Sequence, residues 1–259
     1  MELALGLLVW LFLMLMLEKL WPRRAQTDPT VKRVGVNLLM GVINWALVRL
    51  LVPGGLVVVA FYANGHLWGL WEQIGLNDAP ELFLSIVLLD LAIWAQHLVS
   101  HKWAWLWRIH RVHHLDISVD ASTAVRFHPA EIIISLGYKA ILIVSLGISP
   151  LAIASFEIML AASAMFNHAN LNLSIKLDKV LRKLIVTPDM HRIHHSTDRV
   201  EHDSNYGFFF SFWDRLFGAY TEAPKIAHTQ MPLGLHESRD AKQVRNLGVI
   251  LRAPFFVKV

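Results

Sequence analysis

The stretch ELFLSIVLLDLAIWAQHLVSH, residues 81–101, joins an apolar run to a pair of histidines. Its length suits a helix that crosses the hydrocarbon core of a bilayer, which needs roughly 20 apolar residues. His97 and His101 are four residues apart, so a helix carries both imidazoles on one face. Such a pair alone is as typical of a helix surface as of a metal site. The stretch therefore predicts a membrane span that ends in two candidate metal ligands.

The composition is that of a membrane protein. Of the 259 residues, 55% are hydrophobic and only 17% are charged, and there are ten tryptophans. This apolar share exceeds that of an ordinary soluble domain. The sequence has no cysteine, which excludes disulfides, iron–sulfur clusters and thiolate-bound haem or zinc. The net charge of +4 comes from Lys and Arg spread over connecting segments, which favours a positive-inside bias over a nucleic-acid partner.

Two further apolar runs precede this stretch. Residues 3–17 lack the basic start and the small-residue cleavage site of a signal peptide, so they predict a retained first helix. Residues 34–62 predict a second span, kinked or divided by Pro-Gly-Gly at 53–55. Residues 63–100 contain no Lys or Arg, whereas 19–33 contains five. By the positive-inside rule, the third span then runs inward and the histidines emerge on the cytoplasmic side.

Beyond the third span, the sequence predicts a helical hairpin followed by a polar segment. The two arms of the hairpin meet at Ser149 and Pro150, a natural helix break, and Lys139 and Glu157 make them less lipid-like than the first spans. We expect an all-α integral membrane protein with about four transmembrane helices, or three and a partly embedded hairpin, supporting a cytoplasmic histidine-rich cap. The expected organisation is a single membrane domain, 1–259, with the first three spans (1–100), a first histidine cap segment (101–130), the helical hairpin (131–170), and a cytoplasmic cap with the C-terminal segment (171–259).

Nine histidines fall in four short motifs. These are HLVSH with His97 and His101, HRVHH with His110, His113 and His114, NHAN with His168, and HRIHH with His191, His194 and His195. Two HxxHH motifs in one chain leave few packing explanations, so we interpret the nine as metal ligands. Their number exceeds what one tetrahedral zinc requires and suits two ions of five- or six-fold coordination. Imidazole binds iron, copper, nickel or zinc, but burial at a membrane face without thiolate favours a centre that activates O₂.

The acceptors that would orient these histidines are less evident. Metal-bound imidazoles need a carboxylate or carbonyl on the second ring nitrogen. The candidates are Asp90, Asp116 and Glu131, followed by Asp198 and Asp203. Four histidines without such spacing, His66, His202, His228 and His236, are interpreted as ordinary polar residues. The sequences that flank HRVHH and HRIHH do not repeat, so we expect opposing halves of one two-metal cage rather than copies of one unit.

The motifs follow one another in a specific order over residues 83–220. The order is Asp90-x3-Trp94-x2-His97-x3-His101, HRVHH, RFHPAE at 126–131, NHANL, HRIHHS and NYGFFFSFWDRLFG. This series resembles the sterol desaturase and fatty acid hydroxylase superfamily of membrane-bound di-iron oxidases. The resemblance implies two iron ions that use O₂ to hydroxylate or desaturate an unactivated C–H bond of a membrane lipid, such as a sterol, fatty acyl or ether lipid. It also implies a separate electron donor of cytochrome b5-like or ferredoxin type.

The same resemblance assigns the nine histidines to the family's ligand positions. His128 matches a further family histidine, either as a ligand or as a support for one. There are departures from the family pattern: Trp94 stands where the family often has Tyr, and Leu98 where it often has Arg. Ala164 replaces the first histidine of an HxxxH found in fatty acid 2-hydroxylases. These differences favour the sterol desaturase-like or alkylglycerol monooxygenase-like branches.

Two other functions are compatible with a histidine-rich membrane protein: a divalent metal transporter or carrier, and a metal-dependent lipid hydrolase. Transport would place ligands near the middle of the spans, however, and hydrolysis needs fewer histidines. Without an ER-retention signal or a fused electron-transfer domain, we expect a bacterial inner membrane.

Overall fold

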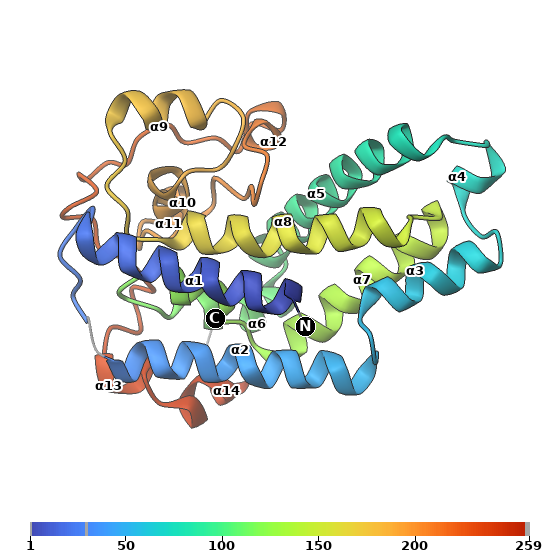
Figure 1. Cartoon of the computed structure of the whole chain (residues 1–259). Coiled ribbons are helices and arrows are strands. Elements are labelled where there is room, and N and C mark those ends of the chain that lie inside the picture. The colour runs from blue at the N-terminus through green and yellow to red at the C-terminus, as the bar shows by residue number, and fades with distance from the viewer. Residues whose placement is uncertain (1, 29–30, 257–259) are drawn as a thin grey trace.

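The chain forms a bundle of long helices with shorter helices gathered mainly at one end (Figure 1). The computed structural model describes residues 2–28 and 31–256, and within these ranges the secondary structure is helical apart from isolated β-bridges. The long helices are α1 (Glu2–Leu20), α2 (Val31–Leu51), α5 (Asp78–Lys102), α7 (Pro129–Leu146) and α8 (Pro150–His168). The shorter elements are α3 (Leu56–Gly65), α4 (Leu70–Gln73), α6 (Ala104–His114), the 3-10 helix η1 (Ala121–Val125), α9 (Ile175–Leu181), α10 (Pro188–His194), α11 (Arg199–His202), α12 (Phe212–Leu216), α13 (Ala241–Val244) and α14 (Leu247–Phe256).

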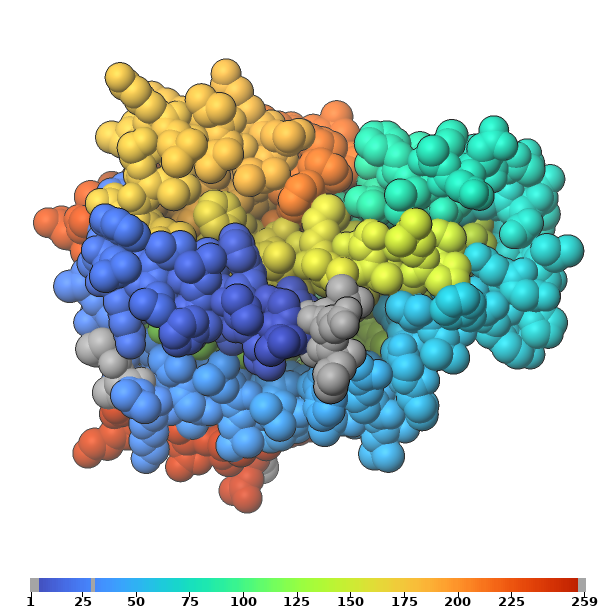
Figure 2. All heavy atoms as spheres, viewed as in Figure 1, coloured from blue at the N-terminus to red at the C-terminus, as the bar shows by residue number. Residues whose placement is uncertain are grey.

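Four stretches of the described chain are long and apolar enough to cross a membrane: Val31–Gln73, Asp78–Lys102, Pro129–Leu146 and Pro150–His168. They confirm the predicted all-helical fold, including two full-length arms for the hairpin. Helix α1 confirms a helix at the first apolar run, and it lies beside α2 and α8 on one face of the molecule (Figure 2). Large apolar side chains point outward on these helices, as on a lipid-facing surface; Leu8, Phe12, Trp45 and Phe83 are examples.

The chain turns at one end of the bundle between spans and enters the cap at the other (Figure 1). The predicted break at 53–55 separates α2 from α3, where Gly54 and Gly55 adopt φ angles of 89° and 71°. At the same end, Gly69 approaches the turn between α7 and α8 so closely that a Cβ on it would lie 2.0 Å from the backbone nitrogen of Gly147. The arrangement fixes which ends of the helices lie together; which side faces the cytoplasm stays a prediction.

The interior of the bundle is apolar where α3, α5, α7 and α8 meet. Leu89, Ile143, Ile153 and Phe156 are all almost fully buried there. A second apolar cluster packs α1 against α8, and a third covers α6 with α14. The cap ends of α5, α6 and α8 are thereby held at fixed positions around the centre described next.

Candidate metal centre

Four helix ends meet at the cap and bring the nine predicted histidines together. His97 and His101 lie at the end of α5, and His110, His113 and His114 on the last turns of α6. His168 is the last residue of α8, His191 and His194 lie on α10, and His195 directly follows α10. All nine are buried, none exposing more than 4% of its surface. The structure therefore brings together the whole set that the motifs single out.

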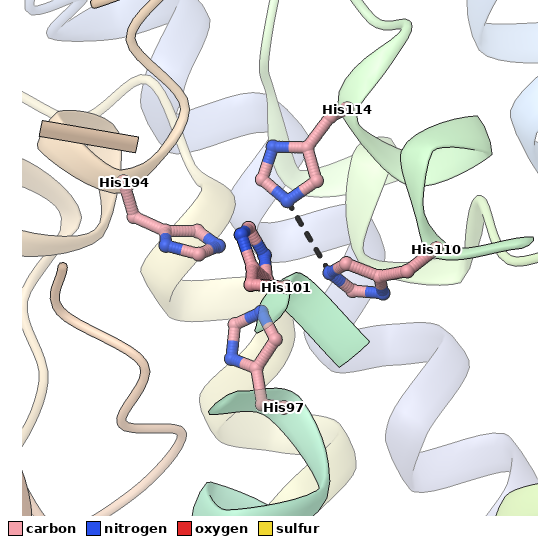
Figure 3. A group of neighbouring side chains, drawn as sticks. All are labelled: His97, His101, His110, His114 and His194. Atoms are coloured by element: carbon pink, nitrogen blue, oxygen red, sulfur yellow. Dashed lines mark hydrogen bonds between the residues drawn. The ribbon is translucent and has the colours of Figure 1, made fainter. Parts of the chain in front are cut away.

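The nine histidines divide into two groups. Group one is His97, His101, His110, His114 and His194, shown in Figure 3, and group two is His113, His168, His191 and His195. Within each group, one ring nitrogen from every member lies within 4.8 Å of the others. The Nε2 atoms of His110 and His114 are 3.3 Å apart, and the Nε2 of His168 lies 3.0 Å from those of His113 and His191. Each group is compact enough to surround one ion.

Each HxxHH motif serves both groups. HRVHH gives His110 and His114 to group one and His113 to group two, whereas HRIHH gives His194 to group one and His191 and His195 to group two. The reason is helical geometry: residues four apart share a face, but adjacent residues point roughly 100° apart. The predicted halves of one cage are thus interleaved, because each motif divides its imidazoles between the two positions.

The second ring nitrogen of most of these histidines is held by an oxygen of the protein. Backbone carbonyls hold the Nδ1 of His97 (Tyr206, 2.8 Å), His113 (Arg126, 3.3 Å), His168 (Ala164, 2.6 Å) and His194 (Ser204, 2.8 Å). The carboxylate of Glu131 lies 2.7 Å from the Nδ1 of His110. Such a partner accepts a hydrogen bond from the Nδ1–H and leaves the Nε2 lone pair free for a metal.

Several Nε2 atoms have no hydrogen-bond partner in the described chain although they are buried. They belong to His97, His101, His194 and His195. A buried polar atom without a partner costs free energy, and a ligand bound by these atoms would offset that cost. A metal ion in each group would bind these lone pairs. The donor set fits two such ions, all ligands being imidazole.

Burial also keeps the cap histidines neutral. It lowers the pKa of His113, His114, His191, His194 and His195 well below the usual value of 6.5, and the neighbouring imidazoles lower it further. The neutral ring is the form that binds a metal, so no proton has to leave at pH 7.

Two of the predicted carboxylate supports, Asp90 and Asp116, bind other groups. Asp90 accepts hydrogen bonds from the backbone of Phe209 and Phe210 and from the indole of Trp213, so it anchors the segment after α11 to α5. Asp116 pairs with Arg33 of α2. Asp90 lies seven residues before His97 and thus on a similar face of α5, but its oxygens accept hydrogen bonds from the backbone of residues 209–210 instead. Of the first three candidates, Glu131 is the one that contacts a histidine.

The other two carboxylate candidates, Asp198 and Asp203, flank α11 at its two ends. Asp203 has an oxygen 3.5 Å from the Nδ1 of His101, and it also pairs with Lys102. Asp198 caps the start of α11 and pairs with Lys225.

His128 occupies the N-cap of α7. Its Nδ1 accepts from the backbone N–H of Ala130, and its Nε2 lies 3.2 Å from the carbonyl oxygen of Leu251 in α14. Both nitrogens are therefore engaged by backbone groups, and the residue belongs to neither histidine group. Its place in the structure is that of a support for α7, the helix that carries Glu131.

His202 is a site residue that the sequence analysis missed. It is 3% exposed, its ring centroid lies 4.4 Å from that of His114 and 4.8 Å from that of His101, and its Nε2 has no partner in the described chain. It forms a third cluster with His101 and Asp203. Spacing could not reveal it, because His202 lies seven residues after His195 and on a separate short helix, α11.

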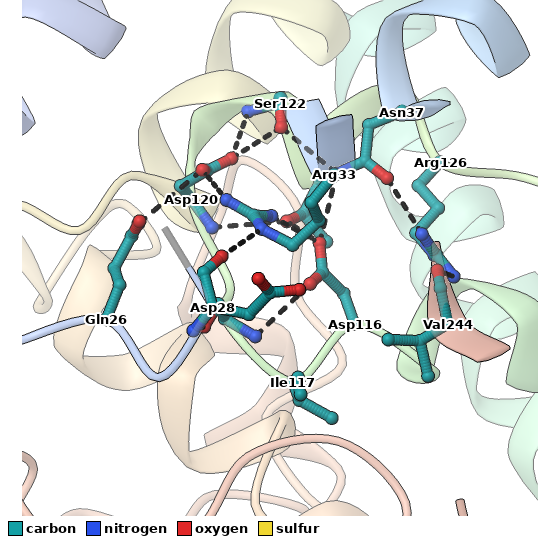
Figure 4. A network of polar contacts seen from close by, with 12 residues as sticks. Gln26, Asp28, Arg33, Asn37, Asp116, Ile117, Asp120, Ser122, Arg126 and Val244 are labelled. Carbon is teal, nitrogen blue, oxygen red and sulfur yellow. Dashed lines mark hydrogen bonds and ion pairs between the residues drawn. The ribbon is translucent and has the colours of Figure 1, made fainter. Parts of the chain in front are cut away.

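A buried polar network holds the loop that follows α6 (Figure 4). Arg33 of α2 pairs with Asp116 and Asp120, and Asn37 donates to Asp116. Arg126 donates to the carbonyl oxygens of Val112 and Val244 and to the amide oxygen of Asn37. Because the carbonyl of Arg126 holds His113, this network links the start of α2 to the orientation of a group two histidine.

A cavity of about 270 Å³ lies next to group one. His97 and His110 line one end, and the remaining wall is mainly apolar, with Ile93, Ile132 and Leu160 from α5, α7 and α8. Ligand pockets usually measure about 300–1,000 Å³, so this space accommodates part of a lipid chain rather than a whole lipid. The histidine groups thus lie beside an apolar cavity between candidate spans.

Fold and site together define an all-helical protein of membrane type with a candidate two-metal, all-histidine centre at one end of its bundle. The chain belongs to the fatty acid hydroxylase family, because the model of that family matches residues 82–219, just over half of the 259 residues. The match covers every histidine of both groups. The comparison with solved structures finds no match to the chain.

Three curated relatives illustrate the range of the family. An ornithine lipid hydroxylase of Rhizobium tropici is 26% identical over 221 residues, which are 83% of this chain and 63% of that protein. The human alkylglycerol monooxygenase is 26% identical over 166 residues, 61% of this chain and 36% of the enzyme. A cholesterol 25-hydroxylase-like protein of Danio rerio is 29% identical over 172 residues, 62% and 66% respectively. The chain thus spans between about a third and two thirds of the length of these relatives.

Proposed function

We propose that the protein is an oxidoreductase that oxidises an unactivated C–H bond of a membrane lipid, by hydroxylation or desaturation, with two iron ions and O₂. The observation that carries the proposal is the pairing of two buried histidine groups with an apolar cavity. The cavity touches His97 and His110, so a lipid chain within it would end beside group one. The relatives, which are named as hydroxylases and a monooxygenase acting on lipids, favour the same reaction class.

Iron is the proposed metal because the relatives are named as hydroxylases and a monooxygenase, and an all-imidazole donor set is compatible with iron. When bound, two iron ions would supply the redox chemistry with O₂ that C–H cleavage needs. The nine histidines would hold them, group one with five imidazoles and group two with four. His202, beside group one, is proposed as an additional support or ligand.

The protein's own contribution is orientation and exclusion of water. The carbonyls and Glu131 that hold the Nδ1 atoms fix the imidazole rings before a metal arrives, which reduces reorganisation. Apolar walls hold the lipid chain in one orientation and keep water from the centre. Because hydroxylation and desaturation both begin by breaking a C–H bond, this arrangement suits either outcome.

Substrate and partners follow as parts of the same proposal. The substrate is a sterol, fatty acyl or ether lipid, in keeping with the lipids named for the relatives. Electrons come from a separate cytochrome b5-like or ferredoxin-type donor. We further propose that the chain is one membrane domain of a bacterial inner membrane, with the histidine cap in the cytoplasm. A transporter is less consistent with histidines that lie at the ends of helices. A hydrolase is less consistent with as many as nine candidate ligands.

The experiment is metal analysis of the purified protein together with O₂ uptake on a lipid extract. We expect about two irons per chain and iron-dependent O₂ consumption with an oxidised lipid product. His194→Ala should lose metal and activity while the protein stays in the membrane. His66→Ala, an exposed histidine at the opposite end of the bundle, is the matched control and should change neither. One bound zinc with no iron-dependent O₂ consumption and no oxidised lipid would overturn the proposal.

A further inference from the structure

The cavity beside group one carries a polar stripe along α7. Glu131, Ser135 and Lys139 line it at intervals of four residues, so they share one face of the helix. Glu157 of α8 lines the same cavity. The stripe runs from Glu131, which holds His110, to a pair of opposite charges deeper in the bundle.

Those charges form an ion pair inside two candidate spans. The Nζ of Lys139 lies 2.5 Å from the Oε1 of Glu157; the side chain of Lys139 is 10% exposed and that of Glu157 is 42% exposed. Lys139 is the eleventh residue of α7 and Glu157 the eighth of α8, so both lie near the middle of their helices. Ionisable groups at such depth are costly, and in membrane proteins they mark substrate or ion pathways.

The ion pair is not needed to hold the hairpin together. Ile143, Ile148, Ile153 and Phe156 are fully buried between and around the same two helices and already pack them. An ion pair with one partly exposed member, such as Glu157, usually stabilises a protein little. A structural role alone would therefore be served as well by two apolar residues, and a ligand explains the charges better.

The chemistry of Lys139 and Glu157 indicates which part of a lipid the ion pair would bind. Together the two side chains carry no net charge, so a charged partner would leave an uncompensated charge in the bundle. The ammonium has three N–H bonds and the carboxylate has several lone pairs, more than their mutual contact uses. A neutral group that both donates and accepts, a hydroxyl or an amide, matches them.

We propose that Lys139 and Glu157 determine substrate specificity by hydrogen bonding a hydroxyl or amide group within the apolar part of the lipid, an inference that rests on the proposed function. Lys139 lies eight residues beyond Glu131, which corresponds to roughly 12 Å along the helix axis. The lipid is therefore anchored about that far from the end of the cavity that meets group one. The carbon oxidised is remote from the anchoring group.

The test compares three phospholipids that differ in one acyl chain: one with a mid-chain hydroxyl, one with a mid-chain amide, and one unsubstituted. We expect the wild type to prefer a polar chain by roughly 10- to 100-fold in kcat/KM, the range for a hydrogen bond to a charged group. The double variant K139M/E157M should lose this preference through KM, with unchanged metal content. The swapped variant K139E/E157K keeps a donor and an acceptor and should retain much of it.

A second readout keeps the inference separate from the proposed function. Binding of the same lipids to metal-free protein, measured by native mass spectrometry, should show the same order in the wild type and no order in K139M/E157M. If the iron-loaded protein oxidises no lipid, the proposed function fails. The order in which the three phospholipids bind metal-free protein then still tests whether Lys139 and Glu157 determine specificity. If wild type and double variant show the same order in both assays, the ion pair is not the determinant.

Discussion

Glu131→Gln provides a direct test of how the centre holds His110. The carboxylate lies 2.7 Å from the His110 Nδ1, and the two side chains are 12% and 2% exposed. The substitution keeps an oxygen acceptor but removes the charge that strengthens the bond and makes the imidazole a better ligand. Loss of such a partner typically costs 10- to 100-fold in metal affinity, or about 1.4–2.7 kcal/mol at 1.4 kcal/mol per tenfold change.

The assay is competition between the protein and a chelator of known affinity, with Fe²⁺ under anaerobic conditions. Glu237→Gln is the control, because Glu237 pairs with Arg111 on the cap, where its side chain is 50% exposed. We expect the control to bind metal as the wild type does. If Glu131→Gln held both metals within twofold of the wild type, the hydrogen bond to His110 would not contribute to ligation.

Two further perturbations test the fold. Gly69→Ala should destabilise the protein by at least about 1–3 kcal/mol, because the φ of 105° is strained for alanine and the Cβ would meet Gly147; Gly137→Ala, in open space on α7, should not. Thermal unfolding in detergent compares the two, and equal midpoints would contradict the contact. Burial lowers the pKa of His228 to about 4, so between pH 6.5 and about 4 the unfolded chain takes up a proton that the folded chain does not. Stability should fall with pH in that window, and less so in His228→Gln; parallel pH profiles would show that His228 is not responsible.

The sequence predicted the helices well because apolar runs and their breaks are local signals. The third span was expected at residues 81–100 and lies at Asp78–Lys102, and the break at 53–55 falls between α2 and α3. Eight of the nine histidines could also be predicted, since spacings of three and four residues place side chains on one helix face. His168 has no such spacing and was matched through the family resemblance.

The partners of those side chains could not be predicted in the same way. Spacing gives the face of a helix but not what packs against it, so it could not show that His113 joins His168 and His191 whereas His114 joins His97 and His194. For the same reason Asp90 was assigned to a histidine, although backbone from residues 209–210 binds it. His202 had no periodic neighbour and is recognised through its tertiary contacts.

Because the two HxxHH motifs are interleaved, the two histidine groups are completed at different stages of synthesis of the chain. Once residue 114 has emerged from the ribosome, four of the five histidines of group one are present, and only His194 is missing. Group two then has His113 alone, gains His168, and needs both His191 and His195 to be complete. If the groups bind metal as proposed, insertion into group two would be a late step that waits for α10 to dock, whereas group one would gather most of its ligands while translation is still under way.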